Sequence, residues 1–460
     1  MGKGALQDLP QIDLVRPITR YAATVTNSAD TGVALDQAVA AAFGSQEEPG
    51  PVVLEFPTDV LRALTQITLP KPAQPQLPIP LDSKELDRAA QLINDARRPL
   101  VITGRGAYGA QPQLQQLLDT TGALYLDTQE SRGLLPDNHP ALVSAVRGET
   151  MRSTDLVIAI GRRFDYQLAY GSPAVFENAR ILCIGRFPSE LNDHIAESIT
   201  LAGDPAVSIN QLNSLLTSSC RDEKWTASLR SKHAERRESL QVRLRKEPLG
   251  ADGYIHPYRL LGAVRDVTTP DAILVADGGD ILSFARIALP NVTYLDPGAL
   301  GCLGIGVPFA TAASIAYPGR PVIAVIGDGS FGFNAIDIDT AARHGATPVF
   351  IIANNGAWNI ERRDQLNRFG SRTAGSLLAY SDYAAMARAF GLHAERVVEA
   401  GELGPAIKRA LYRAPALLDV LLTRDAISPD SQSGLAIVPD LQALTSWDNA
   451  ERLRHDEKKP

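Results

Sequence analysis

Cysteine and histidine are scarce in this sequence. The 460 residues include three cysteines and seven histidines. Cys183, Cys220 and Cys302 lie far apart and show neither the spacing of a zinc site nor the framework of a disulfide-stapled fold. Scattered thiols of this kind are typical of a reducing compartment. The histidines form no metal-binding or catalytic-triad pattern, so none of them is assigned to catalysis.

Long apolar runs and an excess of positive charge are also missing. No apolar stretch is long enough to span a membrane, and the N-terminus lacks the charged-then-apolar pattern of a secretory signal. The formal net charge is −7, which gives no sign of a surface for nucleic acid or another polyanion. We therefore expect a cytoplasmic protein whose partners include neither membranes nor nucleic acid.

What the chain does contain is a repeated alternation of predicted strands and helices. Its length suits two to three domains, and we expect α/β domains with parallel sheets. The predicted order is a short α/β piece (1–66), a Pro-rich linker (67–84), a second α/β unit (85–220), a charged linker helix (221–254), a third α/β domain (255–425) and a C-terminal tail (426–460).

The most informative segment lies in the third α/β domain. Residues 321–326 and 347–353 are expected to form buried strands, with a helix over residues 333–344 between them. Such a unit has parallel strands, so Asp328 and Asn355 would each follow the carboxyl end of a strand, where open α/β sheets bind ligands. A carboxylate and an amide oxygen beside glycine backbone suit a Mg²⁺ ion that also holds phosphate oxygens. The alternative is two ordinary turns, because Gly-Asp-Gly and Asn-Asn are common turn formers.

Three motifs of this domain resemble the signature of thiamine-diphosphate-dependent enzymes. They are Gly327-Asp328-Gly329-Ser330 with Asn354-Asn355, Asp277-Gly278-Gly279-Asp280 after a predicted strand, and the glycine-rich run over residues 298–308. The similar branch includes acetolactate synthase, oxalyl-CoA decarboxylase, 2-hydroxyacyl-CoA lyase and benzaldehyde lyase. The resemblance covers nearly the whole chain. It implies a diphosphate-binding domain at 255–425, a Rossmann-like middle domain at 85–220 and the second half of a pyrimidine-binding domain at 1–66.

The resemblance also implies a cofactor and the residues that bind it. Thiamine diphosphate supplies the reactive carbon of its thiazolium ring, and a Mg²⁺ ion bound by Asp328, Asn355 and the backbone carbonyl of Ala357 would hold its diphosphate. The other residues implied in cofactor binding are Gly278, Gly279, Asp280, Leu303, Gly327, Gly329, Ser330 and Trp358. Leu303 would wedge beneath the cofactor and Trp358 would line the substrate pocket. The alternatives are core packing for Leu303 and Trp358 and a helix N-cap for Asp280.

No catalytic residue is assigned. In the resembling family the pyrimidine-binding domain supplies a glutamate that activates the cofactor, and it belongs to the half of that domain to which residues 1–66 are not similar. The resemblance therefore leaves three explanations open. The missing half with its glutamate is a separate polypeptide of a split enzyme, the sequence is truncated, or the chain binds cofactor without turnover. Because two chains pair in the resembling family, the resemblance also implies a homo- or hetero-oligomer.

A motif in the middle domain points to a different function. Gly104-Arg105-Gly106-Ala107-Tyr108-Gly109 follows a predicted strand, and Asp127 stands at about the distance of a ribose-binding acid. Alone it would indicate a nicotinamide-dependent oxidoreductase, but glycines at such a turn also serve tight packing. Relatives that hold FAD or ADP here usually carry an acidic pair where this chain has Gly185-Arg186-Phe187, and an arginine cannot accept a hydrogen bond from a ribose hydroxyl. We therefore favour a structural middle domain over one that binds FAD or ADP.

The leading hypothesis is a lyase, decarboxylase or carboligase that depends on thiamine diphosphate and Mg²⁺ and acts on small 2-oxo or 2-hydroxyacyl compounds. True acetolactate synthases carry an arginine where this chain has Gln167 and a tryptophan where it has Asp364. Both differences weaken the case for pyruvate condensation, because the arginine's fixed fork is lost. The alternative, from a different functional class, is a non-catalytic cofactor-binding or assembly subunit.

Overall fold

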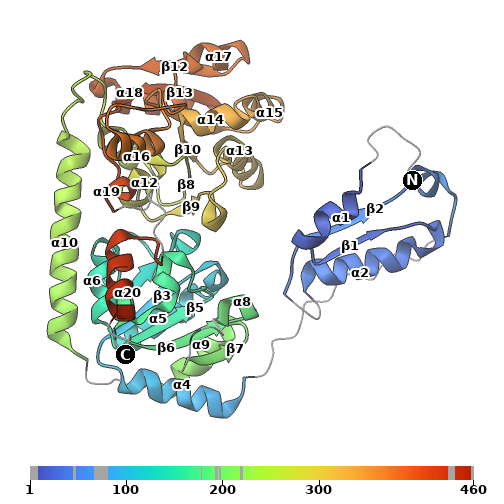
Figure 1. Ribbon diagram of the computed structural model, residues 1–460, viewed down its shortest axis with the longest axis vertical. Coiled ribbons are helices and arrows are strands. Elements are labelled where there is room, and N and C mark those ends of the chain that lie inside the picture. The colour runs from blue at the N-terminus through green and yellow to red at the C-terminus, as the bar shows by residue number, and fades with distance from the viewer. Residues whose placement is uncertain are drawn as a thin grey trace. The chain divides into compact units, whose positions relative to one another are not determined.

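The chain forms two compact units, Met1–Pro80 and Leu81–Pro460, which are described separately (Figure 1). The computed structural model describes residues 9–44, 48–66, 81–177, 179–191, 195, 198–217, 221–433 and 441–456. Within these residues the strands form three sheets, and every pairing between strands is parallel. The predicted α/β class with parallel sheets is therefore confirmed.

The first unit has a small core. Its parallel strands β1 (Tyr21–Thr24) and β2 (Val52–Glu55) are only half-buried. Its helices are α1 (Gln11–Val15), α2 (Thr31–Phe43) and α3 (Thr58–Arg62). These elements fall within the short α/β piece predicted over residues 1–66. The Pro-rich linker falls mainly on residues 67–80, outside the described residues.

The second unit begins with a five-stranded sheet of order β4-β3-β5-β6-β7. Its strands are β3 (Pro99–Thr103), β4 (Leu124–Asp127), β5 (Leu156–Ile160), β6 (Arg180–Gly185) and β7 (Ile199–Ala202). The helices of this region are α4 (Ser83–Asp95), α5 (Gln111–Thr121), α6 (Arg147–Ser153), α7 (Pro173–Phe176), α8 (Pro188–Leu191) and α9 (Pro205–Leu215). Two apolar clusters, one from each face, make this sheet the centre of its own core.

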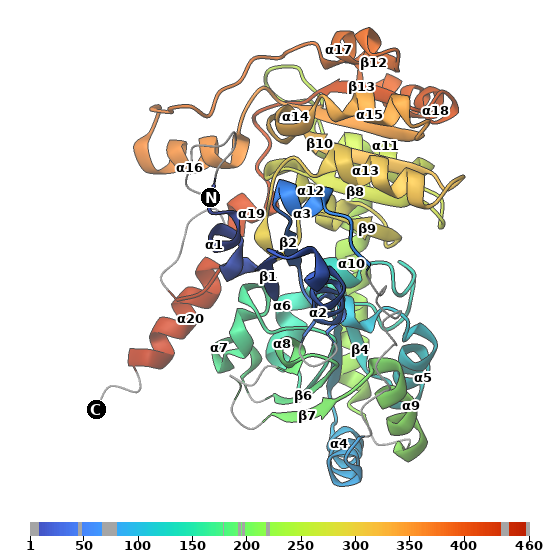
Figure 2. The ribbon, with the colours of Figure 1, turned by 90° about the vertical axis from the view of Figure 1, so that its right-hand side faces the viewer.

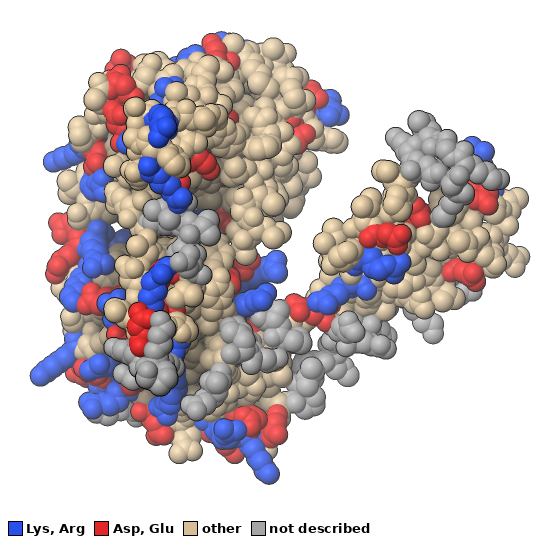
Figure 3. Space-filling model, in the orientation of Figure 1, with Lys and Arg blue, Asp and Glu red and all other residues tan. Residues whose placement is uncertain are grey.

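The charged segment after this sheet forms the long helix α10 (Glu223–Lys246). Asp222 caps it by accepting a hydrogen bond from the Trp225 N–H at 3.0 Å. Helix α10 extends along both sheets of the second unit (Figures 1 and 2). Its residue Leu244 is part of the apolar core of the six-stranded sheet. Acidic and basic side chains are interspersed over the visible face of this unit (Figure 3). Among the described residues, no helix combines the length and apolar character needed to cross a membrane.

The third sheet has six strands in the order β12-β13-β11-β10-β8-β9. They are β8 (Ile273–Asp277), β9 (Thr293–Leu295), β10 (Val322–Gly327), β11 (Pro348–Asn354), β12 (His393–Val397) and β13 (Ala416–Leu421). One face packs against α11 (Pro257–Val267), α12 (Asp280–Ala288) and α18 (Leu403–Tyr412). The other packs against α13 (Gly306–Ala316), α14 (Asp328–Asn334), α15 (Asp337–Arg343) and α17 (Tyr383–Ala389). The remaining helices are α16 (Asn359–Phe369), α19 (Pro429–Ser433) and α20 (Thr445–Asp456).

The helix predicted over residues 333–344 differs from the observed structure. The chain becomes helical at Asp328, and the helix breaks between α14 and α15. Gly329 therefore lies in the first turn of α14 rather than before the helix, and a Cβ atom there would lie 2.7 Å from the Trp358 ring. Asn334, at the end of α14, donates from Nδ2 to the Gly304 carbonyl at 2.7 Å. That bond ties the end of α14 to the glycine-rich segment.

Candidate functional site

The site is built where neighbouring parallel strands end. Strand β10 lies between β8 and β11, and Ile326 pairs with both Asp277 and Ile352. The three strands therefore deliver Asp277, Asp328 and Asn355 to one edge of the sheet. This edge is where an open parallel sheet presents its ligand-binding loops.

A cavity of about 290 Å³ opens at this edge. Its lining includes every residue that the sequence analysis assigned to cofactor or metal binding, namely Gly278, Gly279, Asp280, Leu303, Gly327, Asp328, Gly329, Ser330, Asn355, Ala357 and Trp358. The fold thus brings these positions together from segments far apart in sequence. Their roles in binding stay predictions.

Asp328 is the most unusual group in the cavity. Its side chain is 3% exposed, and its Oδ2 atom has no hydrogen-bond partner. Burial raises the pKa of Asp328 to about 7, although nearby backbone N–H groups act in the opposite direction. A buried carboxylate oxygen without a partner is costly unless a cation or donor binds it. This arrangement fits a hard cation that prefers oxygen ligands.

The loop after β11 supplies the other predicted metal ligands. Asn355 is buried, and its Oδ1 accepts a hydrogen bond from the Ala357 N–H at 3.0 Å. Its backbone carbonyl accepts from Arg424 Nε at 2.8 Å, which fixes the loop. An amide oxygen has a second lone pair, so Asn355 Oδ1 retains capacity for a cation. Within the described residues no group of three or more His, Cys, Asp or Glu side chains could hold a metal, so an ion here would draw on amide and carbonyl oxygens.

The two glycine motifs keep the cavity open. Gly278 has a φ of 131°, a conformation that L side chains rarely adopt. A Cβ atom at Gly329 would lie 2.7 Å from Cζ3 of the Trp358 ring. Both motifs therefore leave backbone accessible where a bulkier residue would not fit.

Asp280 does not cap a helix, so the alternative of an N-cap is wrong. It is the first residue of α12, whose N-cap is Gly279, and no side-chain capping bond forms. Its Oδ2 accepts from Asn359 Nδ2 at 3.1 Å, while Oδ1 has no partner. Burial raises the pKa of Asp280. A second buried carboxylate oxygen is thus available in the same cavity.

Leu303 and Trp358 both line the cavity and are half-buried. The Trp358 ring meets Phe333 edge-on, with the ring centroids 5.9 Å apart. Neither side chain is enclosed in an apolar core cluster. Their position suits a role in shaping the cavity.

The sequence analysis missed the role of Asp277. This fully buried carboxylate accepts hydrogen bonds from the Gly304 N–H at 3.0 Å and the Gly306 N–H at 2.8 Å. It thereby holds the glycine-rich segment, and with it Leu303, against the end of β8. The sequence feature that could have indicated this role is the pair of glycines, Gly304 and Gly306. A Cβ atom at Gly306 would lie 2.6 Å from Ile326 Cγ1 and 3.1 Å from Asp277 Cβ, so only glycine lets the backbone approach here.

The dinucleotide-like motif does not have the geometry of a phosphate-binding turn that opens a helix. After β3 the chain makes a 3₁₀ turn over Arg105–Ala107, and α5 begins only at Gln111. Gly104 and Gly106 donate backbone hydrogen bonds to the carbonyls of Ile160 and Gly161. These glycines thus pack one loop against another. Asp127 is held by Asn291 Nδ2 at 2.8 Å.

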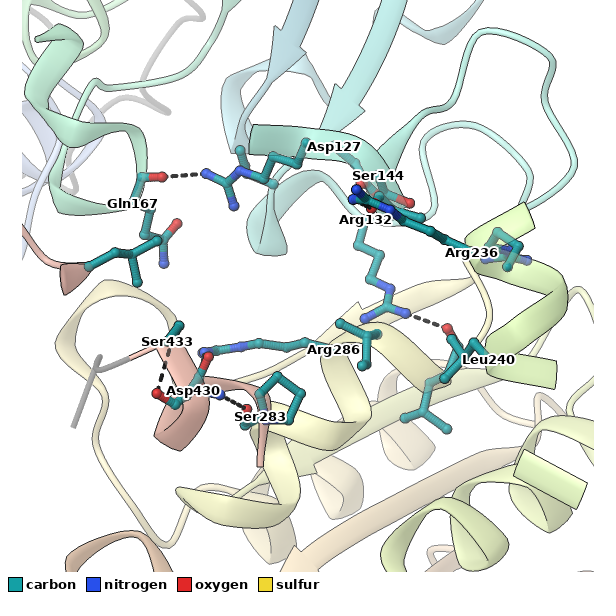
Figure 4. A pocket seen from close by; sticks show the side chains of 18 of the residues that line it. Asp127, Arg132, Ser144, Gln167, Arg236, Leu240, Ser283, Arg286, Asp430 and Ser433 are labelled. Atoms are coloured by element: carbon teal, nitrogen blue, oxygen red, sulfur yellow. Dashed lines mark hydrogen bonds and ion pairs between the residues drawn. The ribbon is translucent and has the colours of Figure 1, made fainter. Parts of the chain in front are cut away.

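A second, larger cavity of about 580 Å³ was not predicted. It lies within the second unit, and residues from the five-stranded sheet and its loops, α10, α12, α19 and α20 line it (Figure 4). Asp127 and Gln167 are on its wall. Arg286 and Asp430 line both this cavity and the smaller one. The two cavities therefore share a wall.

Comparison with known proteins assigns both large sheets of the chain to family models. Residues 279–420 match the model described as "Thiamine pyrophosphate enzyme, C-terminal TPP binding domain". Residues 86–212 match the model described as "Thiamine pyrophosphate enzyme, central domain". The first match includes β10, α14 and β11, which form the edge of the smaller cavity.

Similar proteins extend over most of the chain. A probable acetolactate synthase from Mycobacterium bovis is 29% identical over 445 residues, covering 95% of this chain and 79% of that protein. The 2-hydroxyacyl-CoA lyase 2 of Caenorhabditis elegans is 31% identical over 448 residues, covering 86% and 69%. The 2-hydroxyacyl-CoA lyase 2 of Homo sapiens is 27% identical over 475 residues, covering 92% and 74%.

Proposed function

Because the chain belongs to the thiamine pyrophosphate enzyme family, we propose that it is a lyase, decarboxylase or carboligase that uses thiamine diphosphate and Mg²⁺. Its substrates under this proposal are 2-oxo acids or 2-hydroxyacyl compounds, the classes suggested by the names of its relatives. The family membership itself confirms the resemblance drawn from the motifs.

The observation that carries the proposal is the unpaired Oδ2 of Asp328. In this proposal Mg²⁺ is bound by Asp328, by the side chain of Asn355 and by the carbonyl of Ala357. These groups line one cavity and are hard oxygen ligands. Gly329 and Ser330, at the start of α14, line the same cavity. In this proposal their backbone groups contact the diphosphate.

The bound cofactor supplies a carbon that stabilises negative charge on the substrate. The chain's own residues orient that carbon and control its surroundings. Leu303 and Trp358 line the cavity and would give the bound cofactor an apolar contact surface. Asp277 holds Leu303 in place through the glycine-rich segment. Asp280, with its unpaired Oδ1, provides a polar contact on the α12 side.

Titration calorimetry with thiamine diphosphate tests the proposal. We expect binding that requires Mg²⁺, and at least about a tenfold loss of affinity in Asp328→Ala, because a ligand to the ion is removed. Asp339→Ala is the matched control. It lies on the neighbouring helix α15 and only pairs with Arg343 at 2.6 Å, outside the cavity.

The control variant should bind as the unchanged chain does, since an exposed ion pair contributes little to stability. Absence of binding by well-folded protein would refute the proposal. So would binding that is unchanged in Asp328→Ala. Binding without exchange of the proton on the reactive thiazolium carbon of the cofactor would instead favour a non-catalytic cofactor-binding subunit.

A further inference from the structure

A buried acidic residue lies within the six-stranded sheet, away from the lining of both cavities. Asp419 is part of β13 and has no exposed surface. The other residues of this strand are all apolar, namely Ala416, Leu417, Leu418, Val420 and Leu421. Burying a carboxylate costs free energy unless hydrogen bonds and opposite charge offset it. The partners of Asp419 therefore indicate what this side chain holds in place.

One carboxylate oxygen of Asp419 orients the side chain of Asn354. Asn354 is the last residue of β11 and is fully buried. Its Nδ2 donates to Asp419 Oδ1 at 2.9 Å and to the Ser381 carbonyl at 3.1 Å. Its Oδ1 has no partner among the described residues. Turning the amide over would place this oxygen against the carboxylate, so Asp419 fixes a single orientation.

The other carboxylate oxygen reaches the elements around Asp328. Asp419 Oδ2 accepts from the Tyr383 N–H at 3.3 Å, and it lies 3.5 Å from Arg396 Nε. The Tyr383 ring meets the Phe331 ring edge-on, with the centroids 5.2 Å apart. Phe331 belongs to α14, whose first residue is Asp328. The network behind the sheet edge thus touches the helix that carries one predicted metal ligand and the strand that leads to the other.

Asn355, the second predicted ligand, directly follows Asn354. Because neighbouring residues share a planar peptide bond, a shift of Asn354 is passed to Asn355. The backbone beyond this point has separate support, since the Gly356 carbonyl accepts from the Leu378 N–H at 2.7 Å. The contact with Asp419 therefore anchors the loop at the residue just before the ligand.

Magnesium binding is sensitive to such anchoring. Mg²⁺ requires a nearly ideal octahedron with oxygen ligands at about 2.0–2.1 Å, whereas Ca²⁺ accepts longer and more variable distances. A small displacement of the Asn355 amide oxygen would thus weaken binding of Mg²⁺ more than binding of Ca²⁺.

We propose that Asp419 is a positioning residue for the metal site, and that it acts through Asn354 to hold Asn355 where its amide oxygen binds Mg²⁺. This inference rests on the proposed function, because that function includes Mg²⁺ bound by Asp328 and Asn355. A charge kept inside an apolar sheet then serves the geometry of the site rather than stability. Apolar replacement of buried charges often leaves stability unchanged or raises it, so the two roles can be separated.

Metal titrations of the full chain, with thiamine diphosphate at saturation, test this inference. Mg²⁺ and Ca²⁺ are titrated separately and followed by calorimetry. We expect Asp419→Leu to lower Mg²⁺ affinity by about tenfold or more, as changes to residues that orient metal ligands do. Ca²⁺ affinity should fall less, so the ratio of the two affinities changes. Asp419→Asn should lose less Mg²⁺ affinity, because it keeps an oxygen that accepts from Asn354.

Val420→Ala is the matched control. Val420 is the next residue of β13, is equally buried, and packs in the apolar cluster on the opposite face of the sheet. Its truncation should lower the melting temperature, as core cavities do. Both metal affinities and their ratio should stay as in the unchanged chain. A purely structural role of Asp419 would give the same pattern as this control.

A double substitution tests the route through Asn354. Asn354→Ala removes the side chain that Asp419 holds, and alone it should lower Mg²⁺ affinity about as much as Asp419→Leu does. Adding Asp419→Leu to Asn354→Ala should cause no further loss, because residues that act through one contact are not additive. If Asp419→Leu does not fold, Asp419→Asn replaces it in both arms.

Failure of this inference is distinguishable from failure of the proposed function. The inference alone is overturned when the unchanged chain binds cofactor with Mg²⁺ but Asp419→Leu keeps its Mg²⁺ affinity, or loses affinity for both ions equally. Full additivity of the two substitutions also overturns it. An unchanged chain that binds no thiamine diphosphate with Mg²⁺ overturns the proposed function, and the inference with it.

Discussion

At the scale of single residues, the carboxylate of Asp328 would bind the metal ion but destabilises the protein when no ligand is bound. Its carboxylate is buried with one oxygen unpaired, and burial raises its pKa. At pH 8 the ionised group therefore destabilises the protein in the absence of ligand. We predict that Asp328→Asn unfolds at a higher temperature than the unchanged chain without ligand, and that thiamine diphosphate and Mg²⁺ stabilise it less than they stabilise the unchanged chain. Thermal melts at pH 8 with and without ligand measure both effects. A lower melting temperature without ligand would contradict the first.

Gly329 provides a second prediction at this scale. A Cβ atom there would meet the Trp358 ring at 2.7 Å, so the ring must move. We expect Gly329→Ala to lose about 1–3 kcal/mol of stability, as overpacked sites do, and to bind cofactor more weakly. Trp358→Ala in the same chain should recover part of the lost stability. Denaturant unfolding measures each variant.

Gly332→Ala is the control for that experiment. It lies in the same helix, and a Cβ there would meet nothing within 4 Å. Replacing a helical glycine by alanine at such a position should stabilise by about 0.5–1 kcal/mol. Equal effects of the two substitutions would show that contact with Trp358 is not the cause.

The sequence could reveal a site residue only where its neighbours along the chain predicted its place in the fold. Asp328 and Asn355 stand directly after strongly apolar strands, so their place at the sheet edge could be predicted. Arg147 begins α6, next to the five-stranded sheet, and Arg286 lies on α12, which packs on the six-stranded sheet. Only the tertiary fold brings them to one cavity. No spacing in the sequence predicts that these two residues line the same cavity.

At the scale of elements, neutral histidines hold several turns. His139, His233 and His256 each accept a backbone N–H through Nδ1 at 3.2 Å, from Ala141, Ala145 and Tyr258 respectively. Burial lowers the pKa of all three. At His256 this bond caps α11, and Glu247 at 3.9 Å opposes the shift only in part.

These histidines predict a loss of stability in mild acid. Because the pKa of His256 is lower in the folded protein than its usual 6.5, the unfolded chain takes up the proton first, and stability is lost as pH falls below about 6.5. His256→Asn keeps a good cap without a titrating group. We expect its melting temperature to fall less between pH 7.5 and pH 5.5. The exposed His344→Asn is the control, and an equal fall in both variants would contradict the prediction.

Individual strands could be predicted where a continuous apolar run was too short for a helix and indicated a buried strand. Strands β10 and β11 are such runs and were predicted. Strand β1 was missed because it is only half-buried and carries the small residues Ala22 and Ala23 at its centre. The start of α14 was missed because glycine lowers helix propensity, whereas here tertiary contacts override it.

At the scale of the molecule, the two units differ in how much core each possesses. In the first unit the described residues form one small apolar cluster, Val25, Ala34 and Val60 with two partly buried neighbours, and Ile12 and Ala38 are also buried. The second unit holds the other four apolar clusters. We predict that residues 81–460 expressed alone keep a cooperative thermal transition, and that residues 1–80 alone show none, because so small a core does not offset chain entropy. Calorimetry of the two pieces measures this. A cooperative transition in the small piece would contradict it.

The wall shared by the two cavities makes their contents interdependent. Asp430 is anchored by its own N–H to Ser283 Oγ at 2.9 Å and faces Arg286. Because the ion pair of Arg286 with Asp430 lines both cavities, a ligand that shifted it in one cavity would also change the wall of the other. Such linkage is reciprocal. For any two ligands that shift this wall, the factor by which the first changes the affinity of the second must equal the factor by which the second changes the affinity of the first.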